Sequence, residues 1–280
     1  MNYQWYPGHM TKAKRMMQED IKLIDLVIEL VDARAPLSSR NPDIDELAGN
    51  KARIILLNKS DLSDTAQNGR WAKYYESRGL RVLETNAREG TGVKQIQGLV
   101  REVCREKIER DRRRGIVNRP IRAMVVGIPN VGKSAFINAF AGKSCVRTGN
   151  KPGVTKGKQW IRLNKSLELL DTPGILWPKF EDQNVGKNLA FLGSINDEII
   201  LTQELAQELA DRIRTLYPGM LKNRYQIEES GDSSQILEDL ARVRKCFARG
   251  EELDYEKASG ILIDDFRSGR LGRITLEVAP

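Results

Sequence analysis

Short apolar runs alternate with stretches of helical periodicity through the first part of the chain. The apolar runs Leu26 to Val31, Arg53 to Leu57 and Leu80 to Leu83 predict three buried strands, and a fourth runs from Ile121 to Val126. Helical patterns separate the first three strands, and this β-α-β-α-β order is typical of a mostly parallel, doubly wound α/β sheet. A β-hairpin is predicted further on, over residues 160–170.

Helical patterns occupy both ends of the chain and one long stretch in its middle. Near the N-terminus a basic helix is predicted, with apolar residues near helical spacing at Met10, Ala13, Met17, Ile21 and Ile24. Residues 92–113 predict one long helix, and residues 110–119 form a basic connector. From about Ile195 onward the pattern is helical, with segments near 202–216, 234–249 and 255–268. The sequence therefore predicts two domains, at 1–190 and 195–280.

The stretch from Gly127 to Ser134 follows the fourth predicted strand and fits the phosphate-binding pattern G-x-x-x-x-G-K-[ST]. A helical pattern follows it, so the motif lies in the strand–loop–helix setting that it needs. Backbone N–H groups of such a loop and the positive end of its helix bind anionic oxygens. We expect phosphate contacts from this loop, with Lys133 on the β- and γ-phosphates and Ser134 on Mg²⁺; the predicted phosphate-binding residues here are Asn130, Val131, Gly132, Lys133 and Ser134.

Two further polar motifs follow the second and third predicted strands. Asn58, Lys59 and Asp61 form an N-K-x-D pattern, in which the Asp61 carboxylate can accept hydrogen bonds from N1–H and N2–H₂ of guanine. Adenine offers neither donor, so such a site discriminates between the two bases. Asn86 and Ala87 follow the third strand and could present a backbone N–H to the guanine O6 atom. The sequence therefore predicts a guanine-nucleotide site at the carboxyl ends of parallel strands.

A metal-linked motif ends the second strand of the predicted hairpin. Asp171-x-x-Gly174 fits a carboxylate that binds Mg²⁺, here through water, followed by a glycine that senses the γ-phosphate. Thr155 is a candidate second hydroxyl ligand of Mg²⁺, in a stretch, 142–157, that has no clear period and is predicted to be a mobile loop. The predicted metal ligands are therefore Ser134, Thr155 and Asp171.

Charge is unevenly distributed along the 280 residues, whose formal net charge is +8. Residues 195–280 hold 12 Lys/Arg and 17 Asp/Glu, so the excess of positive charge lies in the first 194 residues. Residues 143–165 hold seven basic side chains and no acidic one, which indicates a polyanionic partner beyond one nucleotide. Three scattered cysteines and the absence of a long apolar run or signal peptide predict a cytoplasmic protein without a membrane segment.

The order of the motifs differs from that of Ras-like GTPases, in which the P-loop comes first and base recognition last. Here the base-reading motifs precede the P-loop, and this order resembles the circularly permuted GTPases, specifically the ribosome biogenesis GTPase A (YlqF) family. The segments that carry the resemblance are 5–10, 31–34, 58–61, 127–134 and 171–180. It implies a circularly permuted Ras-like domain, a C-terminal helical domain, and a cytoplasmic GTPase that assists assembly of the large ribosomal subunit.

The resemblance also bears on hydrolysis. Ras-like enzymes place a glutamine after D-x-x-G to orient the attacking water, but this chain has Ile175 there. The family resemblance suggests His9, the only histidine, as the catalytic residue that reaches this water. Asn130 occupies the position that helps to coordinate K⁺ in potassium-stimulated GTPases. Arg34 and Lys156 are candidate charge stabilisers, although plain surface charge is the better interpretation of both. We expect slow turnover of GTP to GDP by a monomer, stimulated by a partner.

Other functions remain open from the sequence. A signalling switch that binds only proteins would show nucleotide-controlled partners and no RNA dependence, and no lipidation motif supports it. A metabolic P-loop kinase would lack a guanine-reading motif. Basic residues 110–122 and 143–165 are candidate contacts to ribosomal RNA, and the last region could bind a protein through its acidic surface or RNA through Arg242, Arg244, Lys245 and Arg249. The permuted order also predicts an order–disorder switch at 174–188 that reorients 195–280.

Overall fold

A single six-stranded sheet forms the centre of the first part of the molecule. In the computed structural model, which describes residues 8–117, 119–146, 159–197 and 201–280, the strand order is β3-β2-β1-β4-β6-β5. Neighbouring strands are parallel except β5, which pairs antiparallel with β6 as the predicted hairpin. The strands are β1 Leu26–Asp32, β2 Ala52–Asn58, β3 Arg81–Thr85, β4 Ile121–Gly127, β5 Gln159–Asn164 and β6 Leu167–Asp171. The prediction of a mostly parallel α/β sheet is confirmed.

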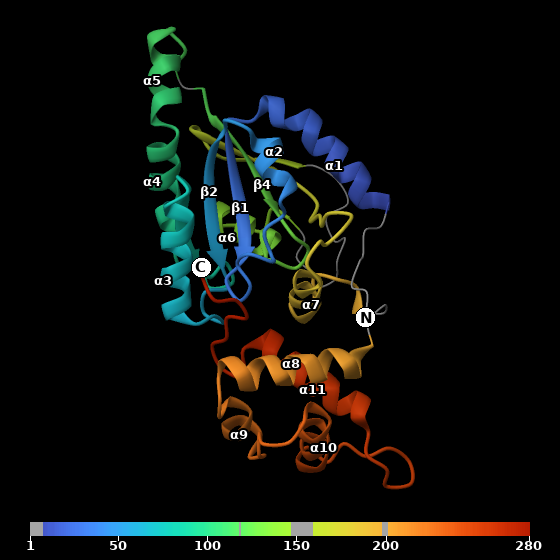
Figure 1. Cartoon of the computed structure of the whole chain (residues 1–280). Helices are drawn as coiled ribbons and strands as arrows, with labels where there is room; N and C mark the ends of the chain where they lie inside the picture. Colours follow the sequence, from blue (N-terminus) through green and yellow to red (C-terminus); the bar gives the residue numbers. More distant parts are fainter. Residues whose placement is uncertain (1–7, 118, 147–158, 198–200) are drawn as a thin grey trace.

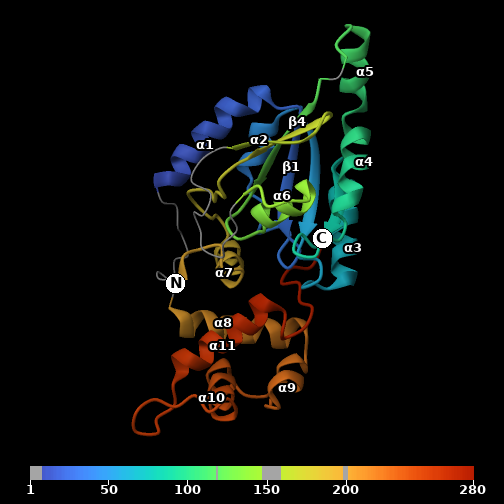
Figure 2. The ribbon, with the colours of Figure 1, turned by 180° about the vertical axis from the view of Figure 1, so that it is seen from behind.

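Helices cover both faces of this sheet, as the alternation of strands and helices predicts. One face is covered by α1 and α2, which pack around Val27 of β1 and Met124 of β4. On the opposite side lies α4, with α3 and α5 following the same edge (Figures 1 and 2). The helices of this part are α1 Gly8–Asp20, α2 Asp43–Ala48, α3 Thr65–Glu76, α4 Val93–Val103, α5 Arg105–Arg113, α6 Lys133–Ala141 and α7 Gln183–Phe191. A short 3₁₀ helix, η1 Ile21–Leu23, follows α1.

Two helix predictions were wrong in extent. The stretch 92–113 is not one helix, because the helix is interrupted at Cys104, which ends α4 and precedes α5. The apolar stripe of α4 packs on the sheet, whereas α5 has no buried residue and extends past the sheet (Figure 1). The predicted helix 234–249 ends earlier, because Lys245 takes a left-handed φ of 52° that stops the helix.

Four helices form a separate bundle, here called the helical region: α8 Thr202–Leu216, α9 Met220–Tyr225, α10 Ser233–Val243 and α11 Tyr255–Ser268. This region lies beneath the carboxyl ends of β1 and β2, next to α7 (Figure 1). The sequence pattern predicts α8, α10 and α11, with α10 shorter than predicted; it does not predict α7 or α9. No helix in the described part of the chain is long and apolar enough to cross a membrane.

The last residues of the chain return from the helical region to the sheet. Ile274 donates its N–H to the carbonyl of Leu62 at 3.0 Å, and Leu276 donates to the carbonyl of Arg34 at 2.7 Å. The indole Nε1 of Trp71 donates to the carbonyl of Glu277 at 3.2 Å. The C-terminal segment therefore fixes the helical region against the loops that follow β1 and β2.

Candidate nucleotide-binding site

The phosphate-binding pattern lies where the sequence predicts it, between β4 and α6. Its two outer glycines are required by close contacts. A Cβ at Gly127 would lie 2.7 Å from the carbonyl oxygen of Leu30, and one at Gly132 would lie 2.5 Å from Nδ2 of Asn58. Gly132 also has a φ of 100°, a conformation that side-chain-bearing residues rarely adopt, and it directly precedes α6. The backbone of this loop therefore leads directly into the N-terminus of α6, which favours anions.

Hydrogen bonds join the base-reading motif to this loop. The amide of Asn58 donates to the carbonyl of Val131 at 2.8 Å and accepts from the backbone N–H of Ala87 at 3.0 Å. Lys59 donates from Nζ to the carbonyl of Asn130 at 2.8 Å. The structure thus brings together three motifs that the sequence separates by up to about 70 residues.

The residues predicted to touch guanine lie around this junction. Asp61 is exposed in the turn after β2, and the N–H of Leu62 closes that turn on the carbonyl of Lys59 at 2.9 Å. Asn86 is buried, and its Oδ1 accepts from the N–H groups of Arg88 and Glu89, which shapes the loop after β3. Asp61 is therefore accessible to a base, while Asn58 and Asn86 hold the two loops that flank it.

Lys133 and Asp171 form the buried charged centre of the site. Nζ of Lys133 donates to the carbonyls of Gly127 and Ile128, both at 3.1 Å. Burial lowers the pKa of Lys133 to about 8, although Asp171 acts in the opposite direction. Burial likewise raises the pKa of Asp171 to about 6, against the effect of the Lys133 charge. Lys133 and Asp171 are therefore poorly solvated, and a charged ligand that binds here would interact with them in place of water.

The donor set fits a magnesium ion. Both carboxylate oxygens of Asp171 are buried without a hydrogen-bond partner among the described residues, although such oxygens normally have one. The hydroxyl of Ser134 lies at the start of α6, and hydroxyl and carboxylate oxygens are the ligands that Mg²⁺ prefers. Thr155, the third predicted ligand, and Lys156 lie outside the described residues.

Gly174 lies against both parts of the phosphate loop. A Cβ at this position would be 2.9 Å from Nζ of Lys133 and 2.9 Å from the backbone N of Pro129. The next residue, Ile175, is buried at 2% exposure and donates its N–H to the carbonyl of Gly127 at 3.4 Å. Any larger residue at 174 would displace the lysine, and the apolar side chain at 175 cannot orient water.

The predicted catalytic residue His9 lies in the first turn of α1, and its side chain is outside the described part of the chain. Its neighbour Met10 is buried, and Sδ of Met10 accepts the N–H of Leu176 at 3.5 Å. The start of α1 therefore contacts the segment that follows Asp171-x-x-Gly174.

Arg34 was misread from the sequence, because it is not a surface charge. It is 1% exposed, and its guanidinium binds both carboxylate oxygens of Asp32 at 2.9 Å. Asp32 in turn accepts from Nζ of Lys59 at 2.8 Å. Burial alone raises the pKa of Asp32, but Arg34 and Lys59 lower it well below its usual value, so the carboxylate stays ionised.

This ion cluster reaches the helical region. Arg34 donates from Nη1 to the carbonyls of Phe266 at 3.5 Å and Arg267 at 3.2 Å, at the C-terminus of α11. A helix C-terminus carries partial negative charge and unpaired carbonyls, so a buried cation stabilises it. Lys59 therefore contacts the phosphate loop directly and α11 through Asp32 and Arg34. The sequence does not predict this role of Arg34, although the segment Val31–Arg34 is one of those that carry the family resemblance.

A second connection joins the phosphate loop to the helical region. The amide of Asn130 donates to the carbonyl of Gly193 at 2.5 Å, and the hydroxyl of Ser194 donates to the carbonyl of Pro129 at 2.9 Å. Arg267 of α11 donates to the carbonyls of Phe191 at 3.0 Å and Ala190 at 2.8 Å, which end α7. Residues 190–194 are therefore held from both sides, by the phosphate loop and by α11.

The fold and motif order define a circularly permuted P-loop GTPase fold, in which base-reading loops precede the phosphate loop. The family model described as "50S ribosome-binding GTPase" matches residues 122–230. The chain is 46% identical over 278 residues to ribosome biogenesis GTPase A of Bacillus cereus, covering 99% of this chain and 94% of that one. It is 33% identical to the Thermotoga maritima protein of the same name, covering 98% and 93%.

Relatives with other names and solved structures agree. The mitochondrial ribosome-associated GTPase 1 of Mus musculus is 32% identical, with 98% of this chain and 90% of that one covered. The crystal structure of GNP-bound YlqF from T. maritima superposes with a TM-score of 0.69 at 28% identity, over 96% of this chain and 98% of that one. A GDP-bound YlqF gives a TM-score of 0.68 at 26% identity, over 94% and 99%. The chain belongs to the ribosome biogenesis GTPase A family.

Proposed function

We propose that this protein binds and hydrolyses GTP to assist assembly of the large ribosomal subunit, associating with the precursor in the GTP state and leaving after hydrolysis. The observation that carries this proposal is the junction of Asn58 and Lys59 with the phosphate loop, in a chain that matches a ribosome biogenesis GTPase along 99% of its length. We infer a monomer that works in the cytoplasm, with its GTPase part at 1–190 and its helical part at 195–280.

Each part of the site has a role in this proposal. Asp61 accepts hydrogen bonds from guanine, and the backbone of Ala87 donates to its O6 atom. The triphosphate lies along 130–134, with Lys133 bound to its terminal phosphates and Gly174 next to the γ-phosphate. Ser134, Thr155 and Asp171 would hold Mg²⁺, which when bound offsets charge that develops on the phosphates.

The alternative, a switch that binds only proteins, is less well supported by the charge distribution. The last turn of α5 carries Arg110, Arg112 and Arg113, the helix buries no residue, and it extends past the sheet (Figure 2). An extended basic helix of this kind suits a polyanion such as ribosomal RNA. In the other predicted RNA segment, 143–165, residues 147–158 lie outside the described part of the chain.

Activation by a partner is tested by the GTPase rate with and without large ribosomal subunits. Because Ile175 cannot orient water and α1 reaches the adjacent segment, we expect slow turnover alone, stimulation by subunits, and loss of that stimulation in His9→Ala. Orientation of water by a general base is worth roughly 10²- to 10⁴-fold. His9→Ala with unchanged GTP affinity but wild-type stimulated rates would contradict the assignment of His9; no stimulation of the wild type would contradict the proposed function.

Potassium activation follows from Asn130. Its amide nitrogen is used by the bond to Gly193, which leaves the amide oxygen, the atom that could coordinate K⁺. We expect faster phosphate release in KCl than in NaCl of equal ionic strength, and loss of this difference in Asn130→Ala. Equal rates of the wild type in the two salts would count against a potassium site.

Coupling between nucleotide and helical region is the third expectation. Arg34 and the Gly193–Ser194 link connect the phosphate loop to α11 and α7, and we propose that nucleotide state alters them, with an order–disorder change at 174–188. Hydrogen exchange in 174–197 and in α11 should therefore differ between GDP and a non-hydrolysable GTP analogue. Arg34→Lys keeps the charge but loses the bidentate geometry, so it should reduce the difference in α11. Identical exchange in both nucleotide states would contradict the coupling.

A further inference from the structure

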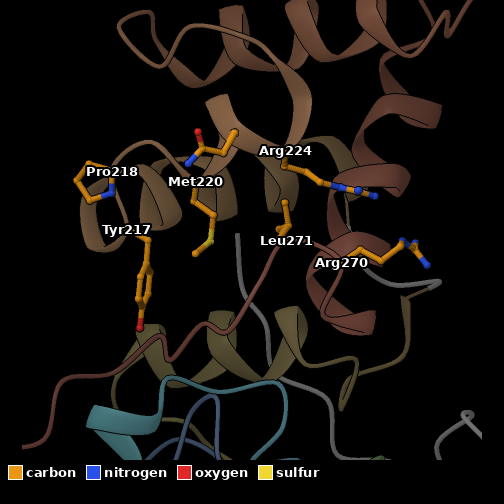
Figure 3. A pocket seen from close by; sticks show the side chains of 7 residues that line it. Tyr217, Pro218, Met220, Arg224, Arg270 and Leu271 are labelled. Atoms are coloured by element: carbon orange, nitrogen blue, oxygen red, sulfur yellow. The ribbon is translucent and has the colours of Figure 1, made fainter.

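A hollow lies in the helical region, away from the nucleotide site. It has a volume of about 440 Å³ and is formed where α8 turns into α9 and where the chain leaves α11. Figure 3 shows Tyr217, Pro218, Met220 and Leu271 on one side of it, and Arg224 and Arg270 beside them with their guanidinium groups extending in the same direction. Ligand pockets commonly have volumes of roughly 300–1,000 Å³, so one nucleotide-sized group fits.

One buried carboxylate holds both arginines in place. Asp265 of α11 is 3% exposed and accepts Nε of Arg224 at 2.9 Å on Oδ2 and Nε of Arg270 at 2.5 Å on Oδ1. The hydroxyl of Tyr225 donates to the same carboxylate at 3.1 Å. Although burial raises the pKa of Asp265, the hydrogen bonds from Arg270, Arg224 and Tyr225 lower it below its usual value.

Asp265 holds both arginines, and the charge of Asp264 also acts on Arg270, so what the rim offers an anion is unused guanidinium N–H groups rather than excess charge. Arg270 binds Asp265 through Nε, so its terminal nitrogens, with four N–H groups, are not used by this bond. Arg244 adds a third cation, 5.2 Å above the ring of Tyr225. Residues 195–280 are acidic as a whole, with 12 Lys/Arg and 17 Asp/Glu, so these three arginines are not part of a general basic surface.

The arrangement suits a phosphate with an attached apolar body. Guanidinium groups bind phosphate oxygens in pairs, and a guanidinium already held by a carboxylate loses less side-chain freedom on binding. Met220 and Leu271 offer apolar contacts for a sugar or a base. The acidic surroundings disfavour a long polyanion lying flat over the region, but they permit one phosphate to enter the hollow.

We propose that this hollow binds one unstacked nucleotide of ribosomal RNA, with its phosphate on Arg224 and Arg270 and its nucleoside against Met220 and Leu271. This inference rests on the proposed function, because it names a contact by which a ribosome-bound GTPase would hold its RNA.

The test measures binding of the full-length protein, with a non-hydrolysable GTP analogue, to purified large ribosomal subunits and to protein-free ribosomal RNA over a series of KCl concentrations. The double variant Arg224→Gln and Arg270→Gln should bind both probes roughly 10-fold more weakly. Its plot of log affinity against log salt should be less steep by about 0.7, the value for one phosphate of a single strand. Asn223→Glu, which places a carboxylate at the exposed lining residue and keeps both arginines, should have the same direction of effect.

Lys257→Gln is the matched control, because it removes one positive charge from the opposite end of α11. It should bind as the wild type does, and all variants should keep the basal GTPase rate. If the variants bind both probes as the wild type does, the hollow does not bind RNA, and the proposed function is unaffected. A loss seen with subunits but not with protein-free RNA would overturn the RNA assignment, and a wild type that binds neither probe would overturn the proposed function and this inference with it.

Discussion

Replacing Asp61 by asparagine is expected to lower the affinity for GTP by on the order of 10⁴-fold, since a site built to pair polar groups rejects a mismatched partner that strongly. The carboxylate accepts two hydrogen bonds from guanine, whereas an asparagine amide would point a donor at the N2 amino group. The same variant should gain affinity for xanthosine triphosphate, because xanthine has a carbonyl in place of that amino group. Equilibrium titration with each nucleotide measures the loss of affinity for GTP and the gain for xanthosine triphosphate.

The exposed carboxylate of Glu76, at the end of α3, provides the control. Glu76→Gln removes the same charge from the far end of α3, outside the site, and should leave both affinities unchanged. Asp61→Asn protein that is folded by circular dichroism and still prefers GTP would show that Asp61 does not read the base.

Lys133→Met is expected to reduce GTP turnover by roughly 10²- to 10³-fold, the usual effect of removing one donor from developing negative charge. Lys133 is buried, and its Nζ is held by two loop carbonyls next to Gly174. A bound triphosphate would replace those weak acceptors with anionic oxygens, so the lysine contributes more to the bound state than to the free protein. Release of phosphate under single-turnover conditions measures the loss.

Lys143→Met is the control, since Lys143 is exposed just after α6. It should hydrolyse GTP at the wild-type rate. A Lys133→Met variant with a wild-type single-turnover rate would mean that the triphosphate does not lie on this loop.

Local patterns predicted the strands and the motifs of the site because each depends on neighbours in sequence. A parallel strand buried on both faces has a continuous apolar run, and a phosphate loop needs glycines at fixed spacing. The convergence of Asn58 on Val131 also follows, because loops at the carboxyl ends of parallel strands share one edge of the sheet. These elements were therefore readable without a structure.

Long-range contacts decided the rest. Arg34 is buried because α11, more than 230 residues later in sequence, places its carbonyls against the guanidinium. Glu277 is equally remote from its partners, the backbone N–H groups of Leu37 and Ser38. No local pattern distinguishes such an arginine or glutamate from an exposed one. The interruption of the helix at Cys104 could not be predicted either. The charged residues after it keep a helical pattern, although α5 no longer packs against the sheet as α4 does.

Competition of ATP against GTP for the purified full-length protein with Mg²⁺ decides whether this site recognises guanine. Because Asn58 and Lys59 join the Asp61 loop to the loop of Lys133, we expect GTP to bind more tightly than ATP by on the order of 10⁴-fold. Equal affinities for the two nucleotides would contradict the guanine site, and with it the proposed GTPase role in ribosome assembly.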